Sequence, residues 1–242
     1  MIIKYSLCWQ GIRKALFFCI ICLWDSRARD QHYKRQFWPL RTTRVIGEFN
    51  VVNEPLVNID DMIPAFLHIK LGLAKQILQE LATIGAAYER AKQLLKLSDA
   101  KMKAGVVNGP QLRILFNDNE FSSLLNRKER RAWKALQEIC SGLLGNNRAH
   151  NYKALVKELI KSFQLLGCNM SLKVHILHAH LDTFPENCGA VSDEQGERTH
   201  QTMKKMVKCY KNKNNGNYDN LLADAIWMDF YDNPNAKHAR KK

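Results

Sequence analysis

The chain has 242 residues, 46% of them hydrophobic and 25% charged, a composition that argues against intrinsic disorder and indicates a globular protein. Its 37 Lys and Arg residues outnumber 23 Asp and Glu residues and leave a formal net charge of +14. This excess predicts a polyanionic partner, either nucleic acid or an anionic membrane surface.

The first 24 residues are mostly apolar and compatible with β-structure. Residues 15–24, ALFFCIICLW, resemble the middle of a signal peptide, but no small-residue cleavage site follows them. Their run is also too short for a membrane span, which takes about 20 residues. We interpret it as a buried strand or helix whose end delivers Cys19 and Cys22. The seven cysteines are widely spread and odd in number, which indicates a reducing compartment rather than a secreted disulfide scaffold.

Residues 25–66 are basic and aromatic and lack helical periodicity, which predicts an ordered loop or linker. From Leu67 to Leu95 apolar residues recur every three or four positions and predict a long helix. Pro110 is placed to open another helix. Gly145 and Gly167 follow two further periodic stretches as natural stops. The remaining helices are predicted at 129–145, 151–167, 170–184, 192–210 and 219–231.

The expected fold is therefore mainly α, with any strands confined to the first 24 residues. The helix predicted at 192–210 has a capping box, Ser192 with Gln195 three residues later.

A zinc site is one interpretation of the histidines in residues 175–180. Two thiolates from the C-x-x-C motif of Cys19 and Cys22 and two imidazoles would complete a tetrahedral zinc site. On a helix His175 and His178 lie about 60° apart, whereas His175 and His180 lie about 140° apart. The second pair could share a metal only if the helix frays or bends. Isolated histidines on an apolar face are otherwise ordinary core or surface residues.

Acidic residues open the helix predicted at 192–210, where Asp193, Glu194 and Glu197 follow Ser192. Negative charge at a helix start is favoured by the unpaired N–H groups and the helix dipole, so capping explains these residues without chemistry. Alternatively, one carboxylate faces inward and helps to hold a divalent cation for phosphoryl chemistry.

Basic residues form four clusters, and each alone is typical of a solvated face. Together with neighbouring aromatic residues they favour contact with a phosphate backbone. The clusters are Arg27, Arg29, Lys34 and Arg35; Arg127, Lys128, Arg130 and Arg131; Lys204, Lys205, Lys208, Lys211 and Lys213; and Lys237, His238, Arg240, Lys241 and Lys242.

Three stretches carry a resemblance to a known family: CIICLWDSRARDQHY, LHIKLGLAKQIL and LGCNMSLKVHILHAHLDTFPENCGAVSDEQGER. They resemble the C-terminal part of a transposon-derived family of arthropod proteins, over nearly the whole chain. That family is more distantly similar to the Transib-type transposases and to the catalytic subunit of the antigen-receptor gene recombinase. These enzymes have an RNase H-like fold and cut DNA with three acidic residues and two Mg²⁺ ions. The shared features are the C-x-x-C, the Leu-His opening a long helix, the His-x4-His, and a Gly-Ala followed by a glutamate.

The resemblance implies that Cys19, Cys22, His175 and His180 hold a structural zinc, with His178 as the alternative ligand. It also implies that Glu197 corresponds to the third catalytic acid. The family's other two catalytic aspartates would fall before residue 1, so we expect no strand cleavage from this chain alone. Mg²⁺ would bind only if those acids were supplied, because both ions take part in two-metal chemistry. An active nuclease that borrows Asp25, Asp30 or Asp182 is a further hypothesis.

The resemblance also sets the expected domain plan, an incomplete RNase H-like fold with a helical insertion. The expected parts are a core remnant with the C-x-x-C (1–24), a basic loop (25–66), a helical insertion domain (67–168), the His-containing and final helices (169–232) and a basic tail (233–242). The leading hypothesis is a truncated, transposase-derived, nuclear DNA-binding protein with no membrane partner. The alternatives are a non-enzymatic interaction module, a regulator that pairs with itself or with full-length transposase, and a non-functional gene fragment.

Overall fold

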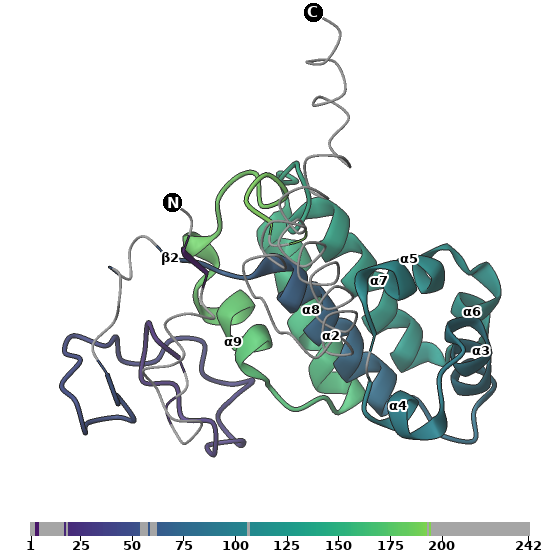
Figure 1. Ribbon diagram of the computed structural model, residues 1–242, viewed down its shortest axis with the longest axis horizontal. Coiled ribbons are helices and arrows are strands. Elements are labelled where there is room, and N and C mark those ends of the chain that lie inside the picture. The colour runs from purple at the N-terminus through teal and green to yellow at the C-terminus, as the bar shows by residue number, and fades with distance from the viewer. Residues whose placement is uncertain are drawn as a thin grey trace, which may run out of the picture. The chain divides into compact units, whose positions relative to one another are not determined.

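The computed structural model describes residues 3–4, 17, 19–53, 58, 62–105, 107–192 and 194. All elements below belong to one compact unit, Met1–Ser192. The expectation of a mainly α fold is confirmed (Figure 1). Its elements are β1 (Ile3–Lys4), β2 (Met62–Ile63), α2 (Phe66–Glu80), α3 (Ala86–Leu95), α4 (Asp99–Lys103), α5 (Gly109–Asn117), α6 (Asn119–Leu124), α7 (Arg127–Gly142), α8 (Tyr152–Leu166), α9 (Leu172–Ala179) and the 3-10 helix η3 (Leu181–Thr183).

The described strands form one short parallel pair, β1 with β2, in which Ile3 lies opposite Met62. The expectation that strands are confined to the first 24 residues is therefore wrong for β2. A two-residue strand is too short to show the alternation that identifies a strand in a sequence. Residues 19–24, expected to form a strand or helix, form neither. Their chain is held instead by isolated antiparallel bridges, one joining Cys22 to Leu40.

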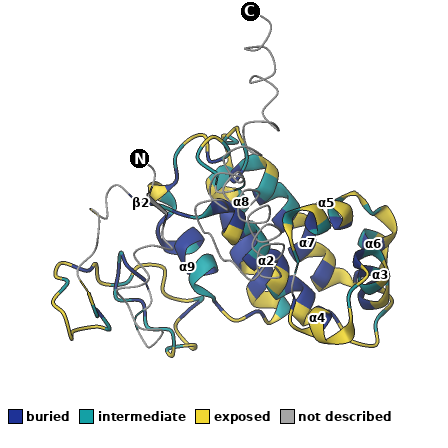
Figure 2. Ribbon diagram, viewed as in Figure 1, coloured by how far each residue is buried: buried dark blue, intermediate teal, exposed yellow. Residues whose placement is uncertain are grey.

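The helical body is built around α7 and α8, which pack side by side, with α2 contacting both of them (Figure 1). Helix α8 buries Val156, Leu159, Ile160 and Phe163, which recur at helical spacing on one face. Helix α7 presents Trp133 to the same core. The dark-blue inner faces of these helices in Figure 2 mark this shared core. Helix α9 contacts both α2 and α8, and these contacts fix the position of its histidines.

The single helix predicted from Leu67 to Leu95 is wrong, because residues 81–85 divide it into α2 and α3. Leu81 is extended and buried, and the Gly85 N–H donates to the Ala82 carbonyl at 2.8 Å to form a turn. Ile84 fits the apolar periodicity but is 97% exposed. The periodicity continues through the break since Leu81 packs into the core from the turn itself.

Local capping explains several helix ends. Helix α5 starts at a capping box between Asn108 and Gln111, and Pro110 lies in its first turn as expected. Helix α8 ends at Gly167, whose φ of +96° is left-handed, also as expected. Helix α7 ends at Gly142 rather than at Gly145. The Gly142 carbonyl accepts from the Ala149 N–H at 2.7 Å, so the turn toward α8 starts early.

Three differences from the predicted helices remain. Helices α4 and α6 are additional to the sequence prediction, and α9 stops at Ala179, short of the predicted end at 184. Apart from Ser192 and Glu194, the helices predicted at 192–210 and 219–231 lie outside the described residues.

Asp118 fastens α6 to α3 and gives a first prediction. It accepts the Phe121 N–H as the cap of α6 and pairs with Arg90 of α3 at 2.7 Å. Asp118→Ala removes both contacts and is expected to cost about 1 to 2 kcal/mol in urea unfolding at neutral pH. Asp118→Asn keeps a capping oxygen and loses only the ion pair, so it should cost less.

The pH dependence of Asp118 follows from the same contacts. Arg90, and secondarily the Phe121 N–H, lower the pKa of Asp118 in the folded protein. The stabilisation is therefore present above the unfolded-state pKa and is lost as the pH falls through the folded-state pKa. The stability gap between wild type and Asp118→Asn should narrow in acid. A gap that stayed constant between neutral pH and pH about 3 would contradict this assignment.

Candidate metal centre

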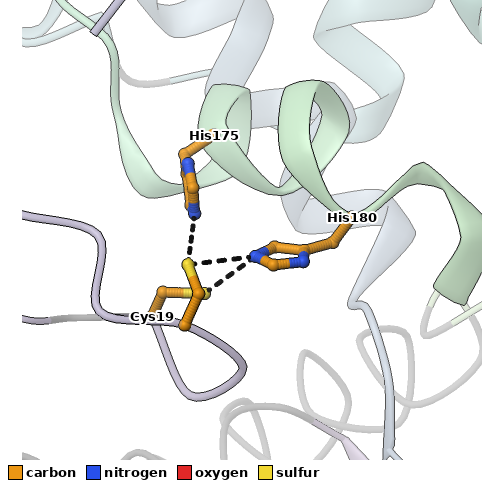
Figure 3. Close-up of side chains that lie close together, drawn as sticks. Cys19, His175 and His180 are labelled. Atoms are coloured by element: carbon orange, nitrogen blue, oxygen red, sulfur yellow. Dashed lines mark hydrogen bonds between the residues drawn. The ribbon is translucent and has the colours of Figure 1, made fainter. Parts of the chain in front are cut away.

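Four side chains from the two ends of the described chain converge in one buried cluster. Cys19 and Cys22 come from the irregular segment that precedes the basic loop, and His175 and His180 come from α9 and its C-terminal end. All four are buried, and their ligand atoms lie within 4.8 Å of one another. Figure 3 shows both imidazoles directed at the cysteine sulfurs. These residues could bind a metal such as zinc.

The end of α9 explains why His180 joins the cluster although helical geometry separates it from His175. The helix stops at Ala179, and His180 has φ −128° and ψ 39°, outside the helical region. The His180 carbonyl then accepts from Thr183 Oγ1 at 2.7 Å, which holds the new chain direction. His178 remains on the helix, half-buried and outside the cluster, and its carbonyl accepts from Gln36 Nε2 at 2.9 Å.

The distances within the cluster fit a tetrahedral site. Cys22 Sγ lies 3.2 Å from His175 Nε2 and 3.3 Å from His180 Nε2, and Cys19 Sγ lies 3.4 Å from His180 Nε2. A tetrahedral zinc with ordinary Zn–S and Zn–N bonds places its sulfur and nitrogen ligands roughly 3.6 Å apart. A shift of a few tenths of an ångström would therefore admit the ion.

The protonation of these groups also suits a cation. Burial raises the pKa of Cys19, but hydrogen bonds from Cys22, His175 and His180 outweigh it and bring that pKa well below its ordinary value. The hydrogen bond with Cys19, together with burial, raises the pKa of Cys22. A bound dication would favour the thiolate form of both sulfurs, because thiolates are the metal-binding form. Burial lowers the pKa of His175, which keeps its imidazole neutral.

An aromatic stack connects the cluster to the basic loop. The Trp24 ring lies parallel to the His175 ring, with centroids 4.7 Å apart, and the His32 ring packs against Trp24 at 5.1 Å. His32 Nε2 in turn lies 2.7 Å from the Asp25 carbonyl oxygen. Tyr33 donates its hydroxyl hydrogen to the Cys168 carbonyl at 2.6 Å. The first part of the loop is therefore anchored to the helical body beside the cluster.

Arg41 also holds the segment that carries Cys19 and Cys22. Its Nε donates to the Cys19 carbonyl at 2.9 Å, and its Nη2 donates to the carbonyls of Phe17 and Phe49 at 3.0 and 3.1 Å. The side chain is buried, and its charge lowers the pKa of Cys22. Sequence reasoning missed Arg41, because no local pattern distinguishes it from its solvated basic neighbours.

The other candidate residues do not form a second metal site within the described part of the chain. Glu197 lies outside the described residues. Asp25 accepts the Arg27 N–H at 2.8 Å, and Asp30 pairs with the adjacent Gln31 at 2.7 Å. Neither of them, nor Asp182, belongs to a described group that could hold a metal.

The basic clusters differ in how free their side chains are. Arg27, Arg29 and Lys34 are exposed. In the second cluster Arg131 pairs with a carboxylate of α8, Glu158, at 2.6 Å, and Arg130 donates to three carbonyls at the end of α6. That cluster therefore serves partly to hold the helices together. The third and fourth clusters lie outside the described residues.

Comparison with known proteins finds two families. Residues 6–57 match a domain of unknown function (DUF8703), and residues 66–145 match another (DUF8704). The first match contains the C-x-x-C and most of the basic loop, and the second contains α2 to α7. No curated protein and no solved structure matches the chain. Among the described residues, no helix combines the length and apolarity needed to cross a bilayer.

Proposed function

We propose that Cys19, Cys22, His175 and His180 hold a structural zinc ion in a DNA-binding protein of transposase descent. The observation that carries this proposal is the buried cluster of two thiols and two imidazoles, drawn from segments 153 to 161 residues apart. Four protein ligands complete a tetrahedral zinc and leave no open position, which is the pattern of a structural site. The bound ion would tie the cysteine segment to α9.

The identity of the second histidine supports the proposed descent. Helical spacing alone favours His178 as the partner of His175, whereas the resemblance to Transib-type transposases selects His180. The described geometry groups His180 with the cysteines and leaves His178 outside. The selection of His180 over His178 contradicts helical spacing, so it supports the proposed descent more specifically than the presence of cysteines and histidines does.

DNA binding is proposed from charge and exposure. The net charge of +14 favours a polyanion, and Arg27, Arg29 and Lys34 project from the loop beside the zinc ligands. The proposed ion would order the segment from which this loop extends. A DNA partner implies a nuclear location.

Salt dependence tests the DNA proposal. The zinc-loaded full chain should bind duplex DNA with an affinity that falls steeply as salt rises. The triple change Arg27→Gln, Arg29→Gln and Lys34→Gln should reduce the slope of log K against log salt by about 3, since each phosphate contact contributes about 0.9. The matched control removes three exposed charges from α8 at Lys153, Lys157 and Lys161. Equal losses for both triples would assign the binding to net charge and overturn the role of the loop.

An interaction module is the second candidate, favoured by exposed apolar residues in the same loop. Phe37 is 71% exposed, and Val45 and Ile46 are 52% and 58% exposed. Exposed apolar groups in one short segment are typical of a protein interface. This candidate would replace the first if the chain bound no DNA and formed an oligomer that Val45→Ser with Ile46→Ser dissociated.

A further inference from the structure

A cavity of about 700 Å³ lies between α2 and α9. None of the four proposed zinc ligands lines it. Its volume is within the range of small-molecule sites. The apolar side chains that line it are Trp24, Pro64, Ile69, Met170, Leu172 and Ile176. The zinc and DNA proposals do not use this cavity.

The charged groups at the cavity are all basic. Lys75 of α2 and Lys173 of α9 line it together with His68, and no Asp or Glu does. No carboxylate of the described residues pairs with Lys173. An anion placed between the two lysines would relieve the repulsion between their positive charges.

Gly72 determines where Lys173 lies. A Cβ at position 72 would stand 2.2 Å from Lys173 Cδ and 2.8 Å from its Nζ, so the lysine stem crosses α2 directly over this glycine. The ammonium group is thereby held at the cavity wall, with its stem packed on backbone.

The polar amides at the cavity are occupied by protein partners. Gln76 donates to the Asn169 carbonyl and accepts from Ser171 Oγ, and Gln79 lies near the carbonyls of Lys103 and Ala104. These two amides are therefore not available to bind a polar ligand such as a nucleobase. We propose that this cavity binds a small amphipathic anion, with its apolar body against Ile69 and Ile176 and its anionic group between Lys75 and Lys173.

A pair of dyes with similar apolar bodies tests this proposal on the zinc-loaded full chain. Anilinonaphthalene sulfonate carries an anionic group, and N-phenylnaphthylamine lacks it. Fluorescence titration should give one saturable site that binds the sulfonate more tightly. Lys173→Gln should weaken sulfonate binding about tenfold, as expected for loss of a hydrogen bond to a charged group, and should leave the neutral dye unchanged.

Two further variants control for folding and for net charge. Gly72→Ala suits a helix but displaces Lys173, so it should weaken sulfonate binding while circular dichroism stays unchanged. Lys157→Gln on α8 removes one exposed charge elsewhere and should have no effect. Equal affinity for both dyes, or equal losses for Lys173→Gln and Lys157→Gln, would overturn the anion site.

Discussion

Replacing Cys22 with serine is expected to abolish stoichiometric zinc binding and to destabilise the folded protein more than any other change considered. Cys22 Sγ contacts both imidazoles, so its loss removes the central ligand of the cluster. A ligand whose free concentration is about a thousand times its Kd stabilises the fold by about 4 kcal/mol. Structural zinc sites commonly exceed this stabilisation. We therefore expect a loss of at least about 4 kcal/mol, measured by thermal unfolding with zinc determined by mass spectrometry.

Two variants serve as controls for the loss of Cys22. Cys140→Ser changes a thiol on α7, and His178→Ala removes the alternative histidine, and both should retain one zinc per chain. If Cys22→Ser does not fold, cobalt added to metal-depleted wild type provides the test, because thiolate ligands give it a sulfur-to-metal charge-transfer band. Zinc content unchanged in Cys22→Ser, or lost in His178→Ala, would contradict the assigned ligands.

The helices that could be predicted from the sequence are those in which periodicity and caps agree. Helix α8 has both an apolar stripe and the left-handed Gly167. The break between α2 and α3 could not be predicted, since Leu81 continues the apolar period from within a turn. Helices α4 and α6, with five and six residues, are too short to show a period. A helix could thus be predicted with its correct end only where an apolar period and a capping residue coincide.

The metal centre shows where residue patterns stop being informative. The C-x-x-C and the three histidines offer residue types that bind zinc, and the choice of four among them came from the resemblance rather than from spacing. The choice between His178 and His180 depends on the end of α9 at Ala179, and no glycine or proline marks this end in the sequence. The surrounding residues were less predictable still. Trp24 and Arg41 reach the cluster through packing of the irregular segment, for which helical or strand periodicity gives no rule.

Arg41→Gln is expected to produce the second-largest effect, a loss of about 3 kcal/mol in unfolding free energy together with faster zinc release. The guanidinium satisfies the carbonyls of Phe17, Cys19 and Phe49, and a buried carbonyl left unpaired costs about 1 to 3 kcal/mol. A shorter, neutral amide cannot reach all three. Loss of a group that orients metal ligands typically weakens metal affinity about 10- to 100-fold. Competition with a chromophoric chelator measures this directly.

Arg41→Lys and Arg29→Gln separate the geometry of Arg41 from its charge. Lysine keeps the charge but lacks the planar fork that serves three carbonyls, so Arg41→Lys should release zinc nearly as fast as Arg41→Gln. Arg29→Gln removes an exposed charge from the same loop and should leave the release rate unchanged. If Arg41→Lys behaved as wild type, the positive charge beside the thiolates would be the important feature. If Arg41→Gln matched Arg29→Gln, Arg41 would have no part in holding the cysteine segment, and the order of that segment would depend on the metal and on Trp24 alone.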